Sequence, residues 1–228
     1  MTNGVARENG GGSVAWAPCP APRPPSRRVG SASSAALSIH RTSAPLAAAR
    51  EALRALDLDL VTFVVANDPW KKTSPTGDGV VEEVSPVGIR LAMVAAAIDG
   101  MDRVQLDDRE VRRGGPSYTA DTLAEYRTDH PEAELFVLVG SDVAPGMDTW
   151  VRPEEVRRRA TIVVMERPGH EGSHPPAGWV HQVLDGSFPD LAGTDLRRMV
   201  AAGQSPESAV PHGVVAVIAE YGLYGAGQ

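Results

Sequence analysis

Two stretches of the chain place small and charged residues where a strand ends or a helix begins. Gly140 and Asp142 close the apolar run "LVGSD"; a glycine admits a nucleotide close to the backbone, and a carboxylate accepts hydrogen bonds from a ribose or a base. In "GTDLR", Thr194 is a helix-capping residue and Arg197 follows one turn later, a spacing suited to clamping phosphate charge. Both stretches indicate binding of a nucleoside phosphate.

Two other stretches offer groups for a small anionic ligand. "RRGGPSYTADTL" places Tyr118 and Thr119 at a helix start, where free backbone N–H groups can hold a carboxylate or a phosphate. "ANDPWKK" follows a strand and adds the positive charge of Lys72, and Trp150 ends the segment that follows Asp142. These stretches therefore indicate a place for a carboxylate or a phosphate.

Taken singly, these residues also fit ordinary structural roles. Thr194 with Arg197 fits a capped surface helix, Trp150 fits a core or lid aromatic, and Lys72 fits a solvated loop. Their order along one chain is therefore more informative than any one of them.

The elements that must position these residues alternate between strands and helices. A helix is predicted from Leu46 to Leu56, then a buried strand in "LVTFVVAND", then a helix from Ser85, with Pro86 in its first turn, to Gly100. Further strands are predicted in "RVQLDD", "AELFVLVGSD" and "TIVVMERP", and further helices in "SYTADTLAEYRTDH", "RPEEVRRRA" and from Thr194 and Pro211. This alternation predicts an α/β fold with a doubly wound parallel sheet. Its ligands are expected after Val65 and Val139, at the carboxyl ends of strands.

Composition sets limits on domains and partners. Residues 1–45 are rich in Pro, Gly, Ser and Arg and are predicted to be a disordered or non-native leader, with a single domain over residues 46–228. The net charge of −7 argues against a nucleic-acid partner. No apolar run approaches the roughly 20 residues of a membrane span. The single cysteine, Cys19, excludes an internal disulfide and a Cys-based zinc site. A cytoplasmic protein without a metal site of its own is expected.

In order, the stretches resemble the bacterial nicotinate-nucleotide adenylyltransferase family. The resemblance runs from about Ala47 to Tyr224, through "ANDPWKK", "IRLAMV", "GGPSYTADTL", "VGSDVAPGMDTW", "GTDLR" and "VPHGVVAVIAEYGLY". It implies a Rossmann-like nucleotidyltransferase fold and transfer of the adenylyl group of ATP to nicotinate mononucleotide, giving nicotinic acid adenine dinucleotide and pyrophosphate. ATP and nicotinate mononucleotide are the implied partners, Mg²⁺ with ATP is the implied cofactor, and a homo-oligomer is left open.

The resemblance also implies roles for particular residues. Those implied to bind ATP are Gly140, Asp142, Gly193, Thr194 and Arg197, of which Thr194 and Arg197 are the catalytic pair. Those implied to bind the acceptor are Tyr118, Thr119 and Trp150 at the nicotinate ring and its carboxylate, with positive charge from Lys72 and Arg90. Gly193 stands where the family usually has a serine, which removes one hydroxyl donor.

One family motif is missing. The family begins with a turn of the form "GGTFDPxHxGH", whose two histidines face the ATP phosphates, whereas this chain has "SSAALSIHRTSAP" with Thr42 and Pro45 at the histidine positions. Reading the codons from Ser34 to Ala44 one base over can spell GGTFDPPHLG, which suggests a frameshift with a compensating shift near Pro45. The second histidine is not recovered. Losing one charge-stabilising donor costs on the order of 10²- to 10³-fold in rate, so the chain as written is expected to lack meaningful turnover.

Two alternatives remain open. A related adenylyltransferase acting on nicotinamide mononucleotide or phosphopantetheine would share these motifs, and comparing acceptors would distinguish it. A nucleotide-binding pseudoenzyme would bind ATP without turnover, because its phosphate-binding turn is missing.

Overall fold

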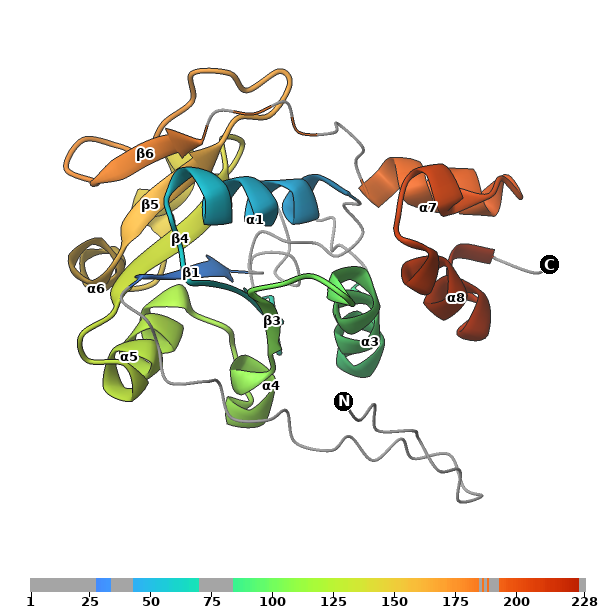
Figure 1. The fold of residues 1–228 in the computed structure, drawn as a ribbon, viewed down its shortest axis with the longest axis horizontal. Coiled ribbons are helices and arrows are strands. Elements are labelled where there is room, and N and C mark those ends of the chain that lie inside the picture. Colours follow the sequence, from blue (N-terminus) through green and yellow to red (C-terminus); the bar gives the residue numbers. More distant parts are fainter. Residues whose placement is uncertain are drawn as a thin grey trace.

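The computed structural model describes residues 28–33, 43–69, 84–184, 186, 188 and 193–225. Its centre is a parallel six-stranded sheet in the order β3-β2-β1-β4-β5-β6 (Figure 1). The strands are β1 (Arg28–Ser33), β2 (Leu60–Val64), β3 (Val104–Asp107), β4 (Glu134–Gly140), β5 (Thr161–Met165) and β6 (His181–Leu184). The strand order reverses between β1 and β4, so the predicted doubly wound sheet is confirmed and its switch point lies there.

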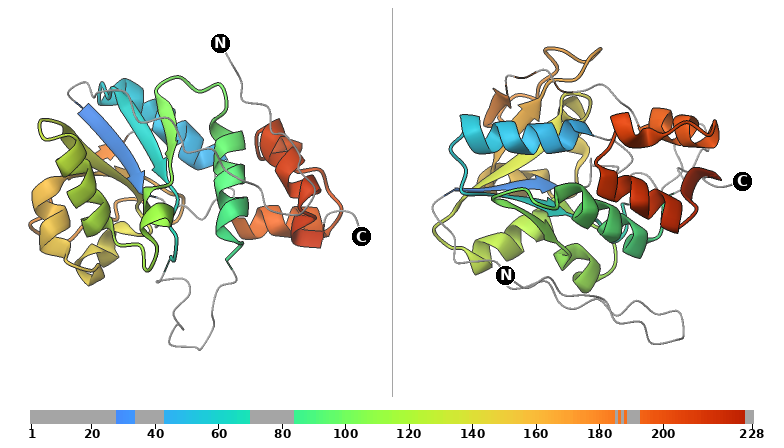
Figure 2. Two further views of the ribbon diagram at one scale, coloured as in Figure 1. Left: turned by 90° about the horizontal axis from the view of Figure 1, so that it is seen from below. Right: turned by 45° about the vertical axis from the view of Figure 1, so that its right-hand side comes forward.

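Helices cover the sheet and extend beyond one side of it (Figures 1 and 2). They are α1 (Ser43–Ala55), α3 (Val87–Ile98), α4 (Arg109–Arg113), α5 (Thr119–Asp129), α6 (Pro153–Arg159), α7 (Gly193–Ala201) and α8 (His212–Glu220). Short 3-10 turns are η1 (Ala144–Thr149), η2 (Pro206–Ser208) and η3 (Leu223–Gly225). None of the helices in these ranges combines the length and the apolar character that crossing a bilayer requires.

Side-chain alternation along the strands builds two cores. On one face, Phe63 and Leu138 pack in a cluster with residues of α1 and α3. On the other, Val137 and Val139 pack in a cluster with residues of α5, η1 and α6. This alternation is expected for strands that are buried on both faces.

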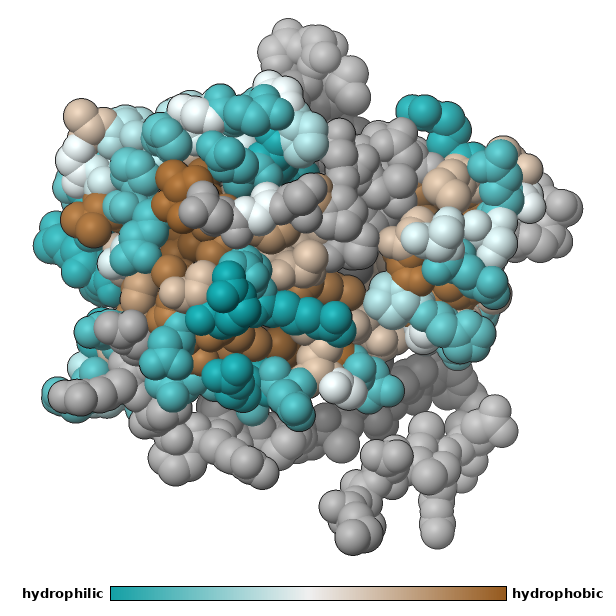
Figure 3. Space-filling view, turned by 45° about the horizontal axis from the view of Figure 1, so that its top comes forward, coloured by the Kyte–Doolittle hydropathy of each residue, from teal (hydrophilic) through white to brown (hydrophobic). Residues whose placement is uncertain are grey.

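A third apolar cluster joins the C-terminal helices to α3. Met93 of α3 packs there with Leu196 of α7 and Val214 of α8. The carboxyl-terminal segment therefore lies beside α3, away from the sheet (Figure 2). On the face drawn in Figure 3, apolar residues gather toward the middle, with hydrophilic residues around them.

Most predicted elements are confirmed, and the omissions are β1, α4 and β6. The sequence pattern missed β6 because three of its four residues, His181 to Val183, are exposed and give no apolar run. It also missed α4, which spans only Arg109–Arg113. α3 begins at Val87, so Pro86 lies directly before the first turn of the helix and not within it, as the sequence predicted.

The structure contains a strand within the predicted leader of residues 1–45. β1 lies inside the predicted leader, yet it occupies the middle of the sheet, with Val29 beside Leu60 and also beside Leu135. α1 likewise begins at Ser43, before residue 46. The physical reason is that a central strand pairs its backbone on both sides, so RVGSAS forms a strand despite its small and polar residues. Residues 1–27 and 34–42 lie outside the described residues. They make up most of the predicted leader and include most of the segment where the family motif is missing.

Candidate active site

The candidate site lies at the carboxyl edge of the sheet, next to the switch point. The first turns of α1 and α7 lie toward each other on this side of the molecule in Figure 1 and in the right-hand view of Figure 2. Each helix spans at least nine residues, and its free N–H groups and dipole favour a negative charge at that end. The fold thus brings two helix N-termini to the edge where the sequence predicts the phosphates of ATP.

The loop after β4 holds an ion pair at this edge. The Nε of Arg167 lies 3.1 Å from Oδ1 of Asp142. The backbone N–H of Arg167 donates to the buried hydroxyl of Ser141 over 2.9 Å, which ties the loop after β5 to the loop after β4. A Cβ at Gly140 would collide with both the Asp142 carboxylate and the Arg167 guanidinium. The absence of a Cβ at Gly140 therefore lets the Asp142 and Arg167 side chains lie against the backbone where the sequence predicts close approach.

Sequence reasoning did not select Arg167 as a site residue. The available signal was its place directly after an apolar strand, in "TIVVMERP", because β5 neighbours β4 and its carboxyl end reaches the same edge. Without the strand order, that adjacency was not visible.

On the β2 side, two loops are joined by backbone and side-chain hydrogen bonds. Asn67 donates its N–H to the hydroxyl of Ser117 over 2.9 Å, and its side-chain amide donates to the Gly115 carbonyl over 3.0 Å. The Ser117 N–H in turn donates to the Asp68 carbonyl over 3.0 Å. Gly114 and Gly115 have φ of 72° and 68°, which favours glycine at both positions of the turn. This paired loop places Tyr118 and Thr119 at the start of α5.

Arg90 fixes the loop after β2 by hydrogen bonds to backbone carbonyls. Its guanidinium donates to the carbonyls of Ala66, Asn67 (3.0 Å) and Ser85 (2.9 Å). Burial lowers the pKa of this guanidinium, and the nearby Asp68 opposes that shift. The structure thus gives Arg90 a role in positioning the loop, and its predicted contact with substrate stays a prediction. Lys72 lies outside the described residues.

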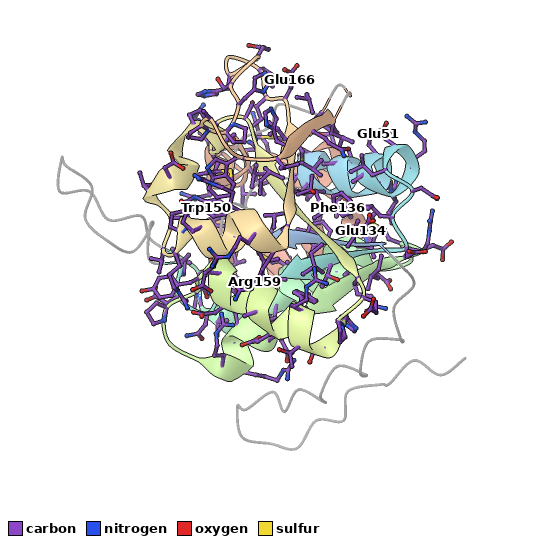
Figure 4. The ribbon with its side chains drawn as sticks, turned by 90° about the vertical axis from the view of Figure 1, so that its left-hand side faces the viewer. Glu51, Glu134, Phe136, Trp150, Arg159 and Glu166 are labelled. Atoms are coloured by element: carbon purple, nitrogen blue, oxygen red, sulfur yellow. The ribbon has the colours of Figure 1, made fainter. Side chains whose placement is uncertain are left out.

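The residues predicted to hold the nicotinate ring lie at the starts of α5 and α6. Tyr118 is the half-buried residue that precedes α5, and Thr119 is its buried first residue. Trp150 follows η1 and packs against the apolar cluster that includes Ala120 of α5. Figure 4 shows α6 beside α5, with Trp150 labelled just before α6. The fold therefore brings the three predicted residues to one region.

A buried network of side chains connects α5 to the end of β3. Arg109 donates to Asp107 over 2.6 Å and stacks 3.5 Å from the ring centroid of Tyr126. The hydroxyl of Tyr126 donates to the same carboxylate over 2.7 Å. Burial and the negative charge of Asp107 raise the pKa of Tyr126 well above 10. The helix that carries Tyr118 is thereby fixed to the end of β3.

The remaining predicted residues lie on α7. This helix begins at Gly193, so Gly193 and Thr194 are in its first turn, as the sequence predicts; the side chain of Thr194 is outside the described residues. Arg197 is half-buried and interacts electrostatically with Tyr224 of η3. Burial raises the pKa of Tyr224, while a hydrogen bond with Ser85 and the charge of Arg197 oppose that shift.

Metal binding by the protein alone has little support among the described side chains. These residues include no group of three or more His, Cys, Asp or Glu that could hold a metal ion. Asp142 is the acidic side chain at the β4 edge, and one carboxylate fits a Mg²⁺ ion that is held mainly by substrate phosphates.

Comparisons with known proteins agree with this geometry. Residues 42–201 match the family model described as cytidylyltransferase-like. A probable nicotinate-nucleotide adenylyltransferase of Saccharopolyspora erythraea is 37% identical over 183 residues, covering 78% of this chain and 82% of that protein. One from Arthrobacter sp. is 36% identical over 190 residues, covering 78% and 83%.

Solved structures share the fold. The Plasmodium falciparum nicotinic acid mononucleotide adenylyltransferase complexed with NaAD superposes with a TM-score of 0.68 at 13% identity, covering 88% of this chain and 98% of that one. A putative nicotinate-nucleotide adenylyltransferase from Vibrio parahaemolyticus gives 0.56 at 18% identity, covering 87% and 96%. The sequence relatives, at 34% identity or more across most of their length, show that the chain belongs to the nicotinate-nucleotide adenylyltransferase family.

Proposed function

We propose that this protein transfers the adenylyl group of ATP to nicotinate mononucleotide, giving nicotinic acid adenine dinucleotide and pyrophosphate. The observation that carries the proposal is the 37% identity to a probable nicotinate-nucleotide adenylyltransferase across 78% of this chain. The family-model match over residues 42–201 includes the loops after β2 and after β4. The reaction is a step of NAD biosynthesis.

The chemistry needs alignment and charge neutralisation. A phosphate oxygen of the mononucleotide attacks the α-phosphorus of ATP in line, a new P–O bond forms, and the bond to the bridging oxygen of pyrophosphate breaks. No covalent bond to the protein is required. Groups that hold the two phosphates close and stabilise the charge on the leaving oxygens supply the rate enhancement.

The chain offers such groups on the phosphate side. The first turns of α1 and α7 supply backbone N–H donors, and Arg197 adds a guanidinium one turn into α7. Arg167, held beside Asp142 at 3.1 Å, is a second cation at the same edge. A Mg²⁺ ion bound to the ATP phosphates would neutralise part of their charge, and the Asp142 carboxylate could contact it.

On the acceptor side, the start of α5 is suited to a carboxylate. Tyr118 and Thr119 present backbone and hydroxyl donors there, and Trp150 packs against the same apolar cluster as Ala120. An aromatic ring with a carboxylate would stack on Trp150 and meet the donors of the helix start.

The experiment compares the chain as written with a variant in which GGTFDPPHLGH replaces residues 35–45, which we call the restored chain. Both are incubated with ATP and, separately, nicotinate mononucleotide, nicotinamide mononucleotide and phosphopantetheine. We expect the restored chain to form nicotinic acid adenine dinucleotide, with a kcat/KM for nicotinate mononucleotide at least about tenfold above that for the other acceptors.

Each other outcome contradicts part of the proposal. A restored chain that prefers another acceptor is a different adenylyltransferase. A restored chain that binds ATP but turns over none of the three acceptors fits the pseudoenzyme. Sequencing the genomic DNA across codons 1–50 tests the frameshift separately. Bases that spell the motif continuously in one frame support a shift in the recorded sequence. Codons for "SSAALSIHRTSAP" whose shifted frame shows no trace of the motif exclude a frameshift.

A further inference from the structure

We propose that Arg152 is a positioning residue that makes the acceptor pocket selective for a negatively charged ring, by neutralising Asp121 beside Tyr118. The inference rests on the proposed function and deepens it, because it concerns how nicotinate mononucleotide is distinguished from nicotinamide mononucleotide. These two acceptors differ in the charge of one ring substituent.

Arg152 links the two elements that hold the predicted ring-binding residues. It follows Trp150 by two positions and is the residue immediately before α6. Its guanidinium Nη2 lies 2.5 Å from Oδ1 of Asp121, in the first turn of α5, which starts directly after Tyr118. The ion pair therefore spans from the segment of Trp150 to the helix start of Tyr118 and Thr119.

The backbone of Arg152 is unusual for a residue with a side chain. Its φ and ψ are both 55°, the left-handed region that favours glycine. A side chain in that region costs about 1 to 2 kcal/mol. The ion pair is exposed, at 43% and 34% of the two side chains, and such pairs contribute about 0 to 1 kcal/mol. The ion pair therefore does not offset the free-energy cost of the left-handed backbone at Arg152. A contribution to folding stability does not explain why an arginine stands at this position.

Charge provides a reason. Asp121 places a negative charge in the first turn of α5, next to the N–H groups that would meet the carboxylate of the acceptor. Left uncompensated, this carboxylate would repel the acceptor. Arg152 cancels that charge through its ion pair with Asp121. The affinity for an acceptor with a neutral amide on its ring would depend little on whether the charge of Asp121 is neutralised.

The other charges near Arg152 are already balanced. Glu155 attracts the Arg152 guanidinium, but its carboxylate pairs with Arg159 over 2.6 Å. Arg157, one turn further, pairs with Asp148 over 2.8 Å and with Glu154. Asp121 is therefore the acidic residue of α5 that the Arg152 guanidinium neutralises.

The test measures dissociation constants of nicotinate and nicotinamide mononucleotides by calorimetry on the restored chain and its variants. Binding of nicotinate mononucleotide to the restored chain comes first, since its absence would overturn the proposed function itself. In Arg152→Gly, we expect the dissociation constant for nicotinate mononucleotide to rise about three- to tenfold, with that for nicotinamide mononucleotide within about twofold. Glycine fits the left-handed backbone, so the melting temperature should not fall.

Further variants separate charge from packing. Arg152→Lys keeps the positive charge and should retain most of the selectivity. Asp121→Asn removes the repelling charge, so adding Arg152→Gly to it should no longer weaken nicotinate mononucleotide. Arg158→Ala is the matched control, because it removes an exposed positive charge from the same helix. Equal weakening of both acceptors by Arg152→Gly, or the same loss of selectivity in Arg158→Ala, would overturn the inference.

Discussion

The two sides of the candidate site are held in different ways. On the acceptor side, Asn67, Asp68 and Ser117 join two loops through direct hydrogen bonds, and Arg90 fixes one of those loops from behind. On the phosphate side, the described ties are the Asp142–Arg167 pair and the Ser141 hydroxyl, and the rest of the site is formed by helix starts.

This difference indicates which step each side controls. The proposed acceptor side is held by hydrogen bonds among the described residues, so we expect it to bind its ligand without help from residues 34–42. The family resemblance assigns the ATP phosphates to the segment between β1 and α1, so we expect changes there to affect turnover far more than acceptor binding. Of the four predictions that follow, the first and third test this division, and the other two test the residues that hold the acceptor side together.

The largest effect is expected from the turn itself. Replacing residues 35–45 with GGTFDPPHLGH should raise turnover at least about 10²- to 10³-fold, because it returns charge-stabilising donors to the ATP phosphates. The dissociation constant for nicotinate mononucleotide, measured in parallel, should change by less than about threefold. A comparable gain in acceptor affinity would show that the two sides are not separate.

A second large effect is expected from Arg90→Met. Removing a buried guanidinium leaves three carbonyls without their donor, so the free energy of unfolding should fall by about 3 kcal/mol in urea titrations. Arg112→Met, at a side chain that is 65% exposed, is the control and should cost less than about 1 kcal/mol. Equal losses in the two variants would argue against the special role of Arg90.

Gly140→Ala should act on the phosphate side alone. The added methyl displaces the Asp142 and Arg167 side chains, so the dissociation constant for ATP should rise about tenfold while the free energy of unfolding changes by less than about 1 kcal/mol. Gly146→Ala, where nothing lies within 4 Å of the new methyl, serves as the control. Unchanged ATP affinity in Gly140→Ala would exclude this pair from the nucleotide site.

The smallest effect is expected from Tyr126→Phe. Losing the hydrogen bond to Asp107 should lower the free energy of unfolding by about 1 kcal/mol at neutral pH. Because the folded pKa of Tyr126 lies above its unfolded value near 10, the native protein loses stability as pH rises past 10, by up to about 1.4 kcal/mol per pH unit. The variant should have a clearly smaller slope, because it keeps only the contributions of other groups such as Tyr224. The exposed Tyr221, changed to Phe, should keep the full slope; an identical alkaline slope in Tyr126→Phe would contradict the assignment.

Much of the fold was predictable because strong periodic patterns dominate it. The strands "LVTFVVA" and "ELFVLVG" are buried on both faces, and their apolar runs identify them without a partner. β1 and β6 were missed for the opposite reason. RVGSAS and HQVL owe their strand structure to neighbouring strands, which no local pattern reveals.

The roles of the site residues stay predictions. Gly140, Tyr118 and Trp150 were selected from strand ends, helix starts and the family resemblance, and the structure places them beside the expected elements. Arg167 and Arg152 were not, because their importance depends on which loops become neighbours in space. Arg90 was found for its charge, but the structure uses that charge on backbone carbonyls.

The position of β1 also has a consequence for synthesis. β1 emerges from the ribosome before the strands it pairs with. About 100 more residues must be synthesised before its partner β4 begins. At about 5 to 20 residues per second, β1 waits on the order of 5 to 20 s without that partner. A strongly apolar strand would be prone to aggregation during this interval, whereas RVGSAS, with its charge, glycine and serines, is not. In the chain as written, the composition that hides β1 from sequence analysis thus also gives the unpaired strand little apolar surface.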